Sequence, residues 1–402
     1  MKNRFTKLAV ALGAVGLMAG AMQAQAQAQD KIKIGYISDL SSLYADLEGK
    51  DAATAIQMAI DDFGGKVLGK PIEMMSFDHQ NKPDLAASKA REWIDTDGLT
   101  MIFSGTNSGT ALALAKVSTE KKRVMINNGA GTSALTNEQC SPYAVHYAYD
   151  TVALSRGSAG AVVANGGKSW FFLTADYAFG HAMEADAAAV VKEKGGTVAG
   201  TVRHPLNATD FSSFLLQAQN SKAQVLALAN AGGDTINAIK AANEFGISKT
   251  MKVVPLLVFF SDIHSLGLKT AQGMQFVTSW YWDMNPEARA FADKYMAKLK
   301  KRPTEIQAAD YSATMNYLKA VQAAGTVDAD KVMETWRGMK MKDFFATGHI
   351  RPDGLYEHDM YLVQVKTPAE SKGAWDYYKI VKQLPGAEVF TTKAEGKCPL
   401  WK

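Results

Sequence analysis

The chain has 402 residues, of which 47% are apolar and 21% are charged, and its formal net charge is +4. These proportions are close to the globular average, and they exclude a disordered, a collagen-like or a coiled-coil chain. The length allows two or three domains. Lys2, Arg4 and Lys7 account for most of the positive balance, so the rest of the chain is nearly neutral. Nucleic-acid-binding proteins usually carry a basic surplus on one domain or stripe, and this chain has no such run.

The N-terminus has the layout of a secretory signal peptide. A basic segment, Met1–Lys7, is followed by the apolar stretch Leu8–Ala21 and then by two overlapping Ala-Gln-Ala sequences within Ala24–Ala28. The apolar stretch has about 14 residues, whereas a membrane span takes ~20. An uncleaved anchor is the alternative. We expect residues 1–28 to be a cleaved signal peptide and the mature protein to be soluble and periplasmic.

The chain has only two cysteines, Cys140 and Cys398. In an oxidising compartment we expect one disulfide, which closes a loop of roughly 260 residues and stabilises the fold by about 5 kcal/mol in the chain-entropy model. Two free buried thiols are the alternative. Neither cysteine has a second cysteine or a histidine at ligand spacing, so we expect no metal site.

Short apolar runs alternate with amphipathic segments along the chain. In the first series, strands are predicted at Ile32–Ser38, Ile72–Phe77, Met101–Phe103 and Val124–Ile126, and helices at Gly49–Phe63, Pro83–Ile94 and Thr110–Ser118. In the second series, strands are predicted at Ser169–Leu173, Thr197–Val202, Val225–Ala229 and Val253–Phe259, and helices at Ala153–Val163, His181–Lys194, Phe211–Gln219 (capped by Asp210) and Thr235–Phe245. Apolar strands alternating with amphipathic helices indicate parallel sheets covered on both faces. The sequence therefore predicts an α/β protein with two Rossmann-like lobes.

The pattern changes after Gly273. Gln275–Trp282 predicts one long strand, and Pro286–Leu299 and Glu305–Ala324 predict two consecutive helices. The tail contains two further strand-like runs, Tyr361–Val365 and Tyr377–Val381. Because no low-complexity linker separates the two series, we expect several chain crossings between the lobes.

Polar, glycine-rich loops follow the predicted strands. Ligands of open parallel sheets bind beyond the carboxyl ends of the strands, so these loops together predict a binding cleft. Their hydroxyls, amides and helix N-termini favour an anion such as a carboxylate, and their aromatic rings suit a flat ligand. The alternative is that turns simply require Gly, Asn and Ser. The candidate binding residues are Ser41, Ser42, Tyr44, Asn107, Ser108, Gly129, Ala130, Gly131, Thr132, Tyr149, Tyr177, Phe179, Asn230 and Asp262.

The sequence contains none of the enzyme motifs G-x-S-x-G, H-E-x-x-H and G-x-x-x-x-G-K-[ST]. Gly129–Ala134 fits G-x-G-x-x-A after a strand, but no helical pattern follows, which argues against a dinucleotide site. The seven histidines are scattered, and no pair has ligand spacing on one helix. We therefore expect a protein that is not an enzyme, with no catalytic residue, metal or cofactor.

Four blocks of sequence carry a family resemblance: KIKIGYISDLSSLYADLEGKDAATAIQMAIDDFGG, INNGAGTSALT, TADYAFGHAMEAD and NATDFSSFLLQAQNSKAQVLALANAGGDTINAIKAANEFGI. In their order and spacing the chain resembles the periplasmic substrate-binding proteins of ABC importers, in the branch of the leucine/isoleucine/valine-binding protein. The resemblance covers nearly all of the mature chain. It implies two lobes joined by three crossings, with a ligand cleft between them, and a closed state that membrane permease subunits recognise. It implies no reaction.

The resemblance also places the crossings, near Tyr149, Gly273–Thr278 and Arg351–His358. The N-terminal lobe then comprises residues 29–149 and 279–352. The C-terminal lobe comprises 150–278 and 353–402, with a tail that can return to the N-terminal lobe through Cys398. We expect a monomer that binds a small-molecule carboxylate and no nucleic acid.

Particular roles follow from the matching positions. The resemblance implies that Asn107 and Ser108 hold a ligand carboxylate, helped by the backbone and the hydroxyl of residues 129–132. It implies that Phe179 or Tyr177 closes over the ligand from the second lobe.

Three positions bear on the identity of the ligand. The G-P-x-x-G opening usual in the family reads Ser41–Leu47 here, and similar proteins with a tyrosine at the place of Tyr44 look like binders of aromatic acids. Arg156 is either a surface helix residue or a bidentate partner of a carboxylate. Asp262 lies near the acid that meets the ammonium group of amino-acid ligands in the family. We expect a small organic acid, in particular an aromatic carboxylate; the alternatives are a branched-chain or other amino acid or amide, a ligand sensor of the same fold, and a periplasmic enzyme.

Overall fold

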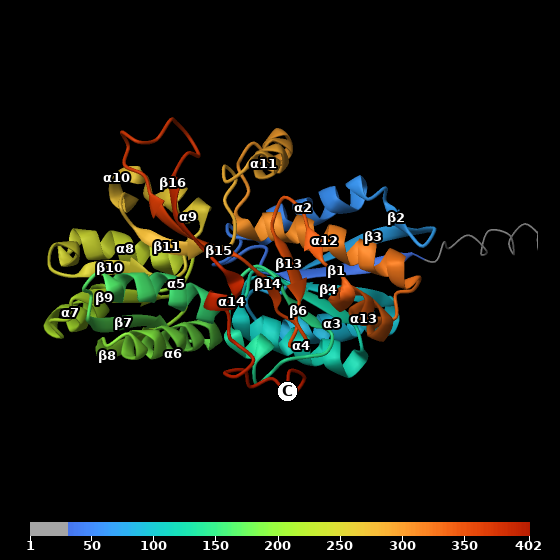
Figure 1. The fold of residues 1–402 in the computed structure, drawn as a ribbon, viewed down its shortest axis with the longest axis horizontal. Coiled ribbons are helices and arrows are strands. Elements are labelled where there is room, and N and C mark those ends of the chain that lie inside the picture. The colour runs from blue at the N-terminus through green and yellow to red at the C-terminus, as the bar shows by residue number, and fades with distance from the viewer. Residues whose placement is uncertain (1–30) are drawn as a thin grey trace, which may run out of the picture.

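The computed structural model describes residues 31–402, so the predicted signal peptide lies outside the described residues. Two α/β lobes lie side by side (Figure 1). The first is built on a six-stranded sheet of order β2-β3-β1-β4-β5-β6, and the second on a four-stranded sheet of order β10-β9-β7-β8. Neighbouring strands in both sheets are parallel apart from the short β2–β3 pair. The predicted fold class is confirmed.

Each lobe alternates strands with helices. The first sheet contains β1 (Ile32–Ser38), β2 (Lys66–Val67), β3 (Lys70–Asp78), β4 (Leu99–Ser104), β5 (Val124–Asn127) and β6 (Ala144–His146). The second sheet contains β7 (Ser169–Ala175), β8 (Thr197–His204), β9 (Val225–Ala229) and β10 (Lys252–Pro255). Two antiparallel sheets of three strands contain β11 (Gln275–Thr278), β15 (Met360–Val365) and β16 (Tyr378–Leu384), and β12 (Met341–Lys342), β13 (Thr347–Ile350) and β14 (Tyr356–His358).

The helices follow the strands closely. The first helices along the chain are α2 (Gly49–Asp62), α3 (Pro83–Thr96), α4 (Ser108–Lys121), the 3-10 helix η1 (Ser133–Thr136), α5 (Thr151–Ala164) and α6 (Ala178–Glu193). The remainder are α7 (Ser212–Asn220), α8 (Gly233–Glu244), the 3-10 helix η2 (Ile247–Lys249), α9 (Phe260–Leu266), α10 (Leu268–Ala271), α11 (Pro286–Leu299), α12 (Glu305–Ala324), α13 (Ala329–Gly338) and α14 (Gly386–Val389).

Alternate strand residues enter different cores on the two faces of each sheet. Ile34 and Tyr36 of β1 share a core with buried residues of α2 and α12. Ile37 instead shares a core with Trp93 of α3 and Leu114 of α4. Because both faces are buried, the strands are apolar throughout, which is why the sequence shows unbroken apolar runs there.

Two local expectations are corrected. The long strand expected at Gln275–Trp282 ends at Thr278, whose hydroxyl donates to the Trp280 carbonyl at 2.9 Å and so turns the chain out of the sheet. Asp210 does not occupy the N-cap of α7. The helix begins at Ser212 after Phe211, and the Asp210 carboxylate accepts the Ser212 N–H at 2.8 Å.

Three crossings join the lobes, as the resemblance implied. The chain passes from β6 to α5, returns from β11 towards α11, and passes from β14 to β15. β11 and β15 pair with each other in antiparallel fashion, so two of the crossings run side by side. The residue boundaries of the lobes stay predictions.

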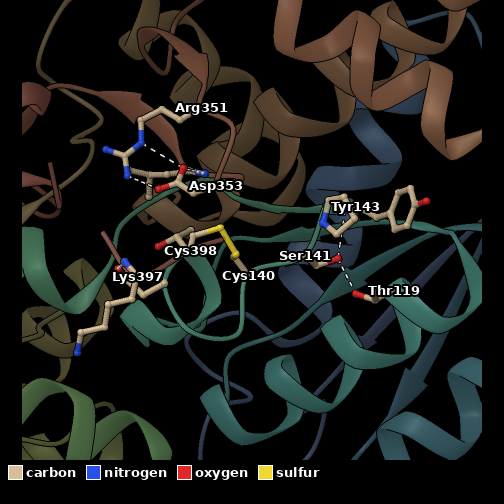
Figure 2. Close-up of a disulfide and its surroundings, with 12 residues drawn as sticks. Thr119, Cys140, Ser141, Tyr143, Arg351, Asp353, Lys397 and Cys398 are labelled. Atoms are coloured by element: carbon tan, nitrogen blue, oxygen red, sulfur yellow. Dashed lines mark hydrogen bonds and ion pairs between the residues drawn. A yellow bond between two sulfur atoms is a disulfide. The ribbon is translucent and has the colours of Figure 1, made fainter. Parts of the chain in front are cut away.

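The C-terminal tail returns to the first lobe. Cys398 forms a disulfide with Cys140, which confirms the predicted pairing (Figure 2). Close to the disulfide, the Arg351 guanidinium pairs with the Asp353 carboxylate and donates to the Thr391 carbonyl at 2.8 Å. The tail is therefore held both by a covalent bond and by a buried ion pair.

Candidate ligand-binding site between the lobes

The loop after β1 is organised by one buried carboxylate. Asp39 is fully buried and accepts the backbone N–H groups of Ser42 and Tyr44 at 2.8 and 2.9 Å. It also accepts the Ser42 hydroxyl at 2.7 Å, while the Ser41 hydroxyl donates to Asp78 at 2.5 Å. The predicted hydroxyls of Ser41 and Ser42 therefore shape the loop. The sequence reading missed Asp39 in this role, although an acid two to five residues before the N–H groups is a typical turn signal.

Tyr44 reaches from the first lobe to the second. Its hydroxyl donates to the hydroxyl of Tyr177 at 2.6 Å, and the ring centroids lie 6.3 Å apart. Phe179 continues this aromatic group, with its ring 6.1 Å from that of Tyr177. Tyr44 and Phe179 are both buried. The structure brings together three predicted residues, and the contact between Tyr44 and Tyr177 joins the two lobes.

A second bridge between the lobes is polar. Asp186 of α6 accepts hydrogen bonds from the hydroxyls of Ser133 at 2.9 Å and Thr151 at 2.6 Å. Ser133 follows the predicted loop 129–132 of the first lobe, and Thr151 begins α5. The interlobe contact is therefore made by both aromatic and polar side chains.

The α4 N-terminus lies beside the loop after β5. Asn107 caps the helix, with its Oδ1 accepting the Thr110 N–H at 3.1 Å. The hydroxyl of Ser108 accepts the Thr132 N–H at 3.3 Å. Asn107, Ser108 and Thr132 are all buried. The unpaired N–H groups of the first helical turn and the positive end of the helix dipole favour a negatively charged ligand group here.

The loop after β5 needs its glycines. A Cβ on Gly131 would lie 3.0 Å from the Phe179 ring, and one on Gly129 would lie 2.2 Å from the Thr106 hydroxyl. The Gly129 carbonyl accepts the Tyr149 hydroxyl at 2.6 Å, and the Ala130 carbonyl accepts Asn127 Nδ2 at 2.7 Å. These small residues let side chains from both lobes approach the loop closely.

Two predicted residues of the second lobe are bonded within that lobe. Asn230 Oδ1 accepts the Thr235 hydroxyl at 2.7 Å, and its Nδ2 lies 3.1 Å from His204. One oxygen of Asp262 accepts the Phe259 N–H at 3.0 Å. Burial raises the pKa of Asp262 to about 7, so its proton binding is shifted into the neutral range.

Arg156 is placed with the C-terminal tail. Its Nη1 donates to the Phe390 carbonyl at 2.6 Å, and its Nη2 pairs with Glu395 at 2.7 Å. It lines a 400 Å³ cavity that also includes Thr132 and Asp186. Both donating nitrogens are thus used by the tail, which supports a structural reading of Arg156.

The sequence reading missed three buried acids in and beside the helices α2 and α12. Glu48 precedes α2, and Glu305 and Asp310 lie on α12; their exposed fractions are 1%, 2% and 0%. Burial raises the pKa of all three, to about 8 for Glu305 and about 7 for Asp310. The available signal was an acid among the small apolar residues of a predicted core helix, as at Asp310.

Residues 31–402 contain no helix of sufficient length and apolarity to cross a bilayer. Within the same range no three acidic, histidine or cysteine side chains gather in a way that could hold a metal ion.

Comparison with known proteins identifies the architecture. The family model of the periplasmic binding proteins matches residues 31–374. A periplasmic binding protein from Burkholderia mallei is 62% identical, with a TM-score of 0.92 over 93% of this chain and 100% of the other. A branched chain amino acid ABC transporter periplasmic ligand-binding protein from Burkholderia xenovorans LB400 is 40% identical, with a TM-score of 0.82 over 92% of this chain and 100% of the other.

A more distant structure shows the same fold. The solute binding protein of an ABC transporter from Rhodopseudomonas palustris BisB5, in complex with 3,4-dihydroxy benzoic acid, is 24% identical, with a TM-score of 0.80 over 89% of this chain and 98% of the other. The family resemblance read from the sequence is confirmed by the family match and by the two more similar structures. The chain therefore belongs to the periplasmic binding protein family, as a solute-binding protein of an ABC transporter.

Proposed function

We propose that this protein captures a small organic carboxylate, in particular one with an aromatic body, between its lobes and delivers it to the permease subunits of an ABC importer. The observation that carries the proposal is the hydrogen bond between Tyr44 and Tyr177, which joins aromatic side chains of opposite lobes at 2.6 Å. A ligand that contacts both lobes at once favours the closed state over the open one. Phe179 adds a third ring to the same group.

The carboxylate end of the ligand would lie at the N-terminus of α4. Asn107, Ser108 and Thr132 are buried there, and their hydrogen bonds hold the loop against the helix. Helix N-termini stabilise anions through their free N–H groups and the helix dipole. The predicted residues Gly129–Thr132 support this arrangement because they leave room for rings from the second lobe.

The second candidate function is binding of a branched-chain or other amino acid. Asp262 favours it, because an acid in the second lobe can meet an ammonium group, and so does the Burkholderia xenovorans structure at 40% identity. An aromatic acid is bound by the Rhodopseudomonas palustris protein. A sensor that presents its closed state to a membrane receptor differs from both candidates in its partner and not in its ligand.

Binding measurements on the exported protein, unfolded and refolded to remove any bound ligand, test the proposal. Thermal shifts and calorimetry would compare benzoate and its hydroxy derivatives with aliphatic and aromatic amino acids. Ligand at about 100 times its Kd should add roughly 2.7 kcal/mol to the unfolding free energy. Binding only of ligands without a carboxylate would contradict the proposal.

A Tyr44→Ala variant tests the aromatic part of it. If the ring lies against a planar ligand, the variant should weaken an aromatic acid far more than a small aliphatic one. Equal losses would remove the argument for an aromatic body while leaving the carboxylate proposal in place.

A further inference from the structure

One carboxylate of the second lobe binds a hydroxyl of the first lobe. Asp186 lies on α6, and its Oδ2 accepts the Ser133 hydroxyl at 2.9 Å and the Thr151 hydroxyl at 2.6 Å. Thr151 Oγ1 in turn accepts the Ser133 N–H at 3.1 Å. The three residues therefore form a closed ring of hydrogen bonds, which we call the Asp186 ring.

The Asp186 ring joins three parts of the molecule. Ser133 begins η1 of the first lobe, Thr151 begins α5 directly after the first crossing, and Asp186 comes from α6 of the second lobe. Figure 1 shows α6 beside the first lobe, next to α4. Separation of the lobes would carry Ser133 away from Asp186. The hydrogen bond between these two residues therefore depends on the lobes being in contact.

The ring lies at the edge of the interlobe contact. A cavity of 400 Å³ beside it is lined by Ser133 and Glu138 of the first lobe, by Asp186, and by Glu395 of the tail. Thr151 is fully buried, whereas Ser133 and Asp186 are partly buried. Opening of the lobes would therefore change the hydration of Ser133 and Asp186 while the rest of α6 keeps its place in the second lobe.

The same helix carries a matched arrangement that stays within the second lobe. Glu184 Oε2 accepts the Thr174 hydroxyl at 2.6 Å and the Thr201 hydroxyl at 3.0 Å. Thr174 lies on β7 and Thr201 on β8. Because residues two positions apart on a helix do not face each other, Glu184 binds its own sheet while Asp186 binds the first lobe. The two acids differ in what they join and not in the kind of bond that they make.

The two hydroxyls of the ring offset the burial of the carboxylate. Burial, as the largest cause, and the charge of Glu138 raise the pKa of Asp186. The hydroxyls of Thr151 and Ser133 lower it, and so does the charge of Arg156, but the net shift is upward. The ionised carboxylate is thus placed at the contact at a cost that its hydrogen bonds reduce. Loss of the Ser133 hydroxyl would remove one of them.

We propose that Asp186 is a positioning residue for ligand capture, which fastens α6 to Ser133 of η1 when the lobes close. This inference deepens the proposed function and rests on it, because it requires that the ligand is held between the lobes. Asp186 would act on the closure of the lobes, and the ligand itself would be bound by other residues. The bond adds a polar fastening to the aromatic contact between Tyr44 and Tyr177.

Loss of the Ser133 hydroxyl should be felt mainly in the release of the ligand. The bond forms only after the lobes meet, so its removal should raise the dissociation rate and leave the association rate nearly unchanged. Ser133→Ala should raise the dissociation rate and the Kd roughly tenfold, since a hydrogen bond to a charged group contributes more than one between neutral groups. Ser133→Thr keeps a hydroxyl at this position and should recover most of the loss.

The acceptor is tested in the same way. Asp186→Ala removes both hydrogen bonds and should weaken binding at least as much as Ser133→Ala. Asp186→Asn should retain binding, because its amide oxygen can accept the hydroxyls and burying an amide costs less than burying a carboxylate. Stopped-flow fluorescence on the refolded protein measures both rates, with benzoate, 4-hydroxybenzoate, phenylalanine, leucine and benzamide as the probes.

The matched arrangement on α6 supplies the controls. Thr201→Ala and Glu184→Gln change the same kinds of group on the same helix, but their bonds stay inside the second lobe. Both variants should keep the association and dissociation rates within about twofold, because surface substitutions away from a contact have small effects.

A second measurement needs no knowledge of the ligand. Nitroxide labels on Lys116→Cys of α4 and Lys192→Cys of α6, both exposed positions, report the distance between the lobes by electron–electron resonance. The two native cysteines are joined to each other and are not labelled. Ser133→Ala should lower the fraction of molecules with the short distance, with and without the probes, and Thr201→Ala should leave it unchanged.

The outcomes separate this proposal from the one on which it rests. Equal changes in Ser133→Ala and Thr201→Ala, or no change in either measurement, overturn the role of Asp186. Equal losses in Ser133→Ala and Ser133→Thr also overturn it, because the hydroxyl would then not be the cause. Binding of benzamide alone contradicts the proposed carboxylate function, and its faster release from Ser133→Ala would still support the Asp186 ring.

Discussion

Two regions of the molecule bury acidic side chains in opposite ways. Beside the disulfide, Asp353 is 1% exposed and pairs with Arg351, whose guanidinium also lies over the Trp401 ring with its Cζ 4.0 Å from the centroid. Around α2 and α12, Glu48 and Asp310 are buried as deeply, but no ion pair among residues 31–402 includes either carboxylate. A compensated acid holds the tail in place, whereas burial without a cation raises the pKa of an acid and favours its protonated form.

Removing the cation from the compensated pair should have the largest effect. Arg351→Met leaves the Asp353 carboxylate buried without its paired cation, which should lower the free energy of unfolding by about 3–5 kcal/mol. Denaturant unfolding measures this loss. The double variant Arg351→Met/Asp353→Leu should recover much of it, because no buried charge is then left unpaired. Equal losses in the single and double variants would show that the ion pair is not what distinguishes this region.

The disulfide should rank next. Replacing Cys140 and Cys398 with alanine frees the tail from the first lobe, and loss of a native disulfide typically costs about 2–5 kcal/mol. Adding a reductant to the unmodified protein should lower its melting temperature to about that of the double variant. The melting temperature of the double variant itself should not change with reductant. A reductant effect on the variant would point to a cause other than this bond.

Glu305, a buried acid at the start of α12, should make stability depend on pH. Burial raises the pKa of Glu305 to about 8, whereas an unfolded chain gives glutamate a pKa of about 4.3. Between these values the folded state binds more protons than the unfolded state, so the free energy of unfolding falls as the pH rises, by up to about 1.4 kcal/mol per pH unit for one group.

Glu305→Gln should therefore flatten the decline of stability between pH 5 and pH 8. Urea unfolding at several pH values measures the two slopes. An unchanged slope in the glutamine variant would mean that Glu305 is not the group responsible.

The aromatic bridge between the lobes should have a smaller effect. Tyr44→Phe removes the hydrogen bond to Tyr177 but keeps the ring, and a net hydrogen bond contributes about 1 kcal/mol, or roughly a fivefold change in ligand affinity. Tyr143→Phe is the control, because its hydroxyl bonds Asp330 on a helix of the first lobe, and it should leave ligand affinity unchanged. Equal effects of the two variants would contradict a role for the bridge in closure.

The smallest effect is expected at Arg156. Its bond to Glu395 is partly exposed, since the side chains are 22% and 49% accessible. Arg156→Gln should lower stability by less than about 1 kcal/mol. Ligand affinity should stay within twofold, because the guanidinium is used by the tail. A large loss of affinity would restore Arg156 as a partner of the ligand carboxylate.

The amino-acid sequence by itself determined the alternation of strands and helices, the two lobes and the identity of the loops at the strand ends. These features depend on the spacing of apolar residues and on turn chemistry, which are local properties of the chain. The candidate residues Tyr44, Tyr177 and Phe179 could be found in this way because each lies a few residues after a predicted strand. Asp39 was missed because its role depends on which N–H groups the loop turns towards it.

Only the tertiary structure decided which buried charges are paired. Glu48 and Asp310 are far apart in the sequence, so no local pattern shows that the fold buries both of them without a basic partner. Arg156 carries a guanidinium that suits a ligand carboxylate, yet the tail returned by Cys398 places Phe390 and Glu395 against it. Charge compensation is a long-range property, because the partner of a buried group is set by how distant segments pack and not by its neighbours in the chain.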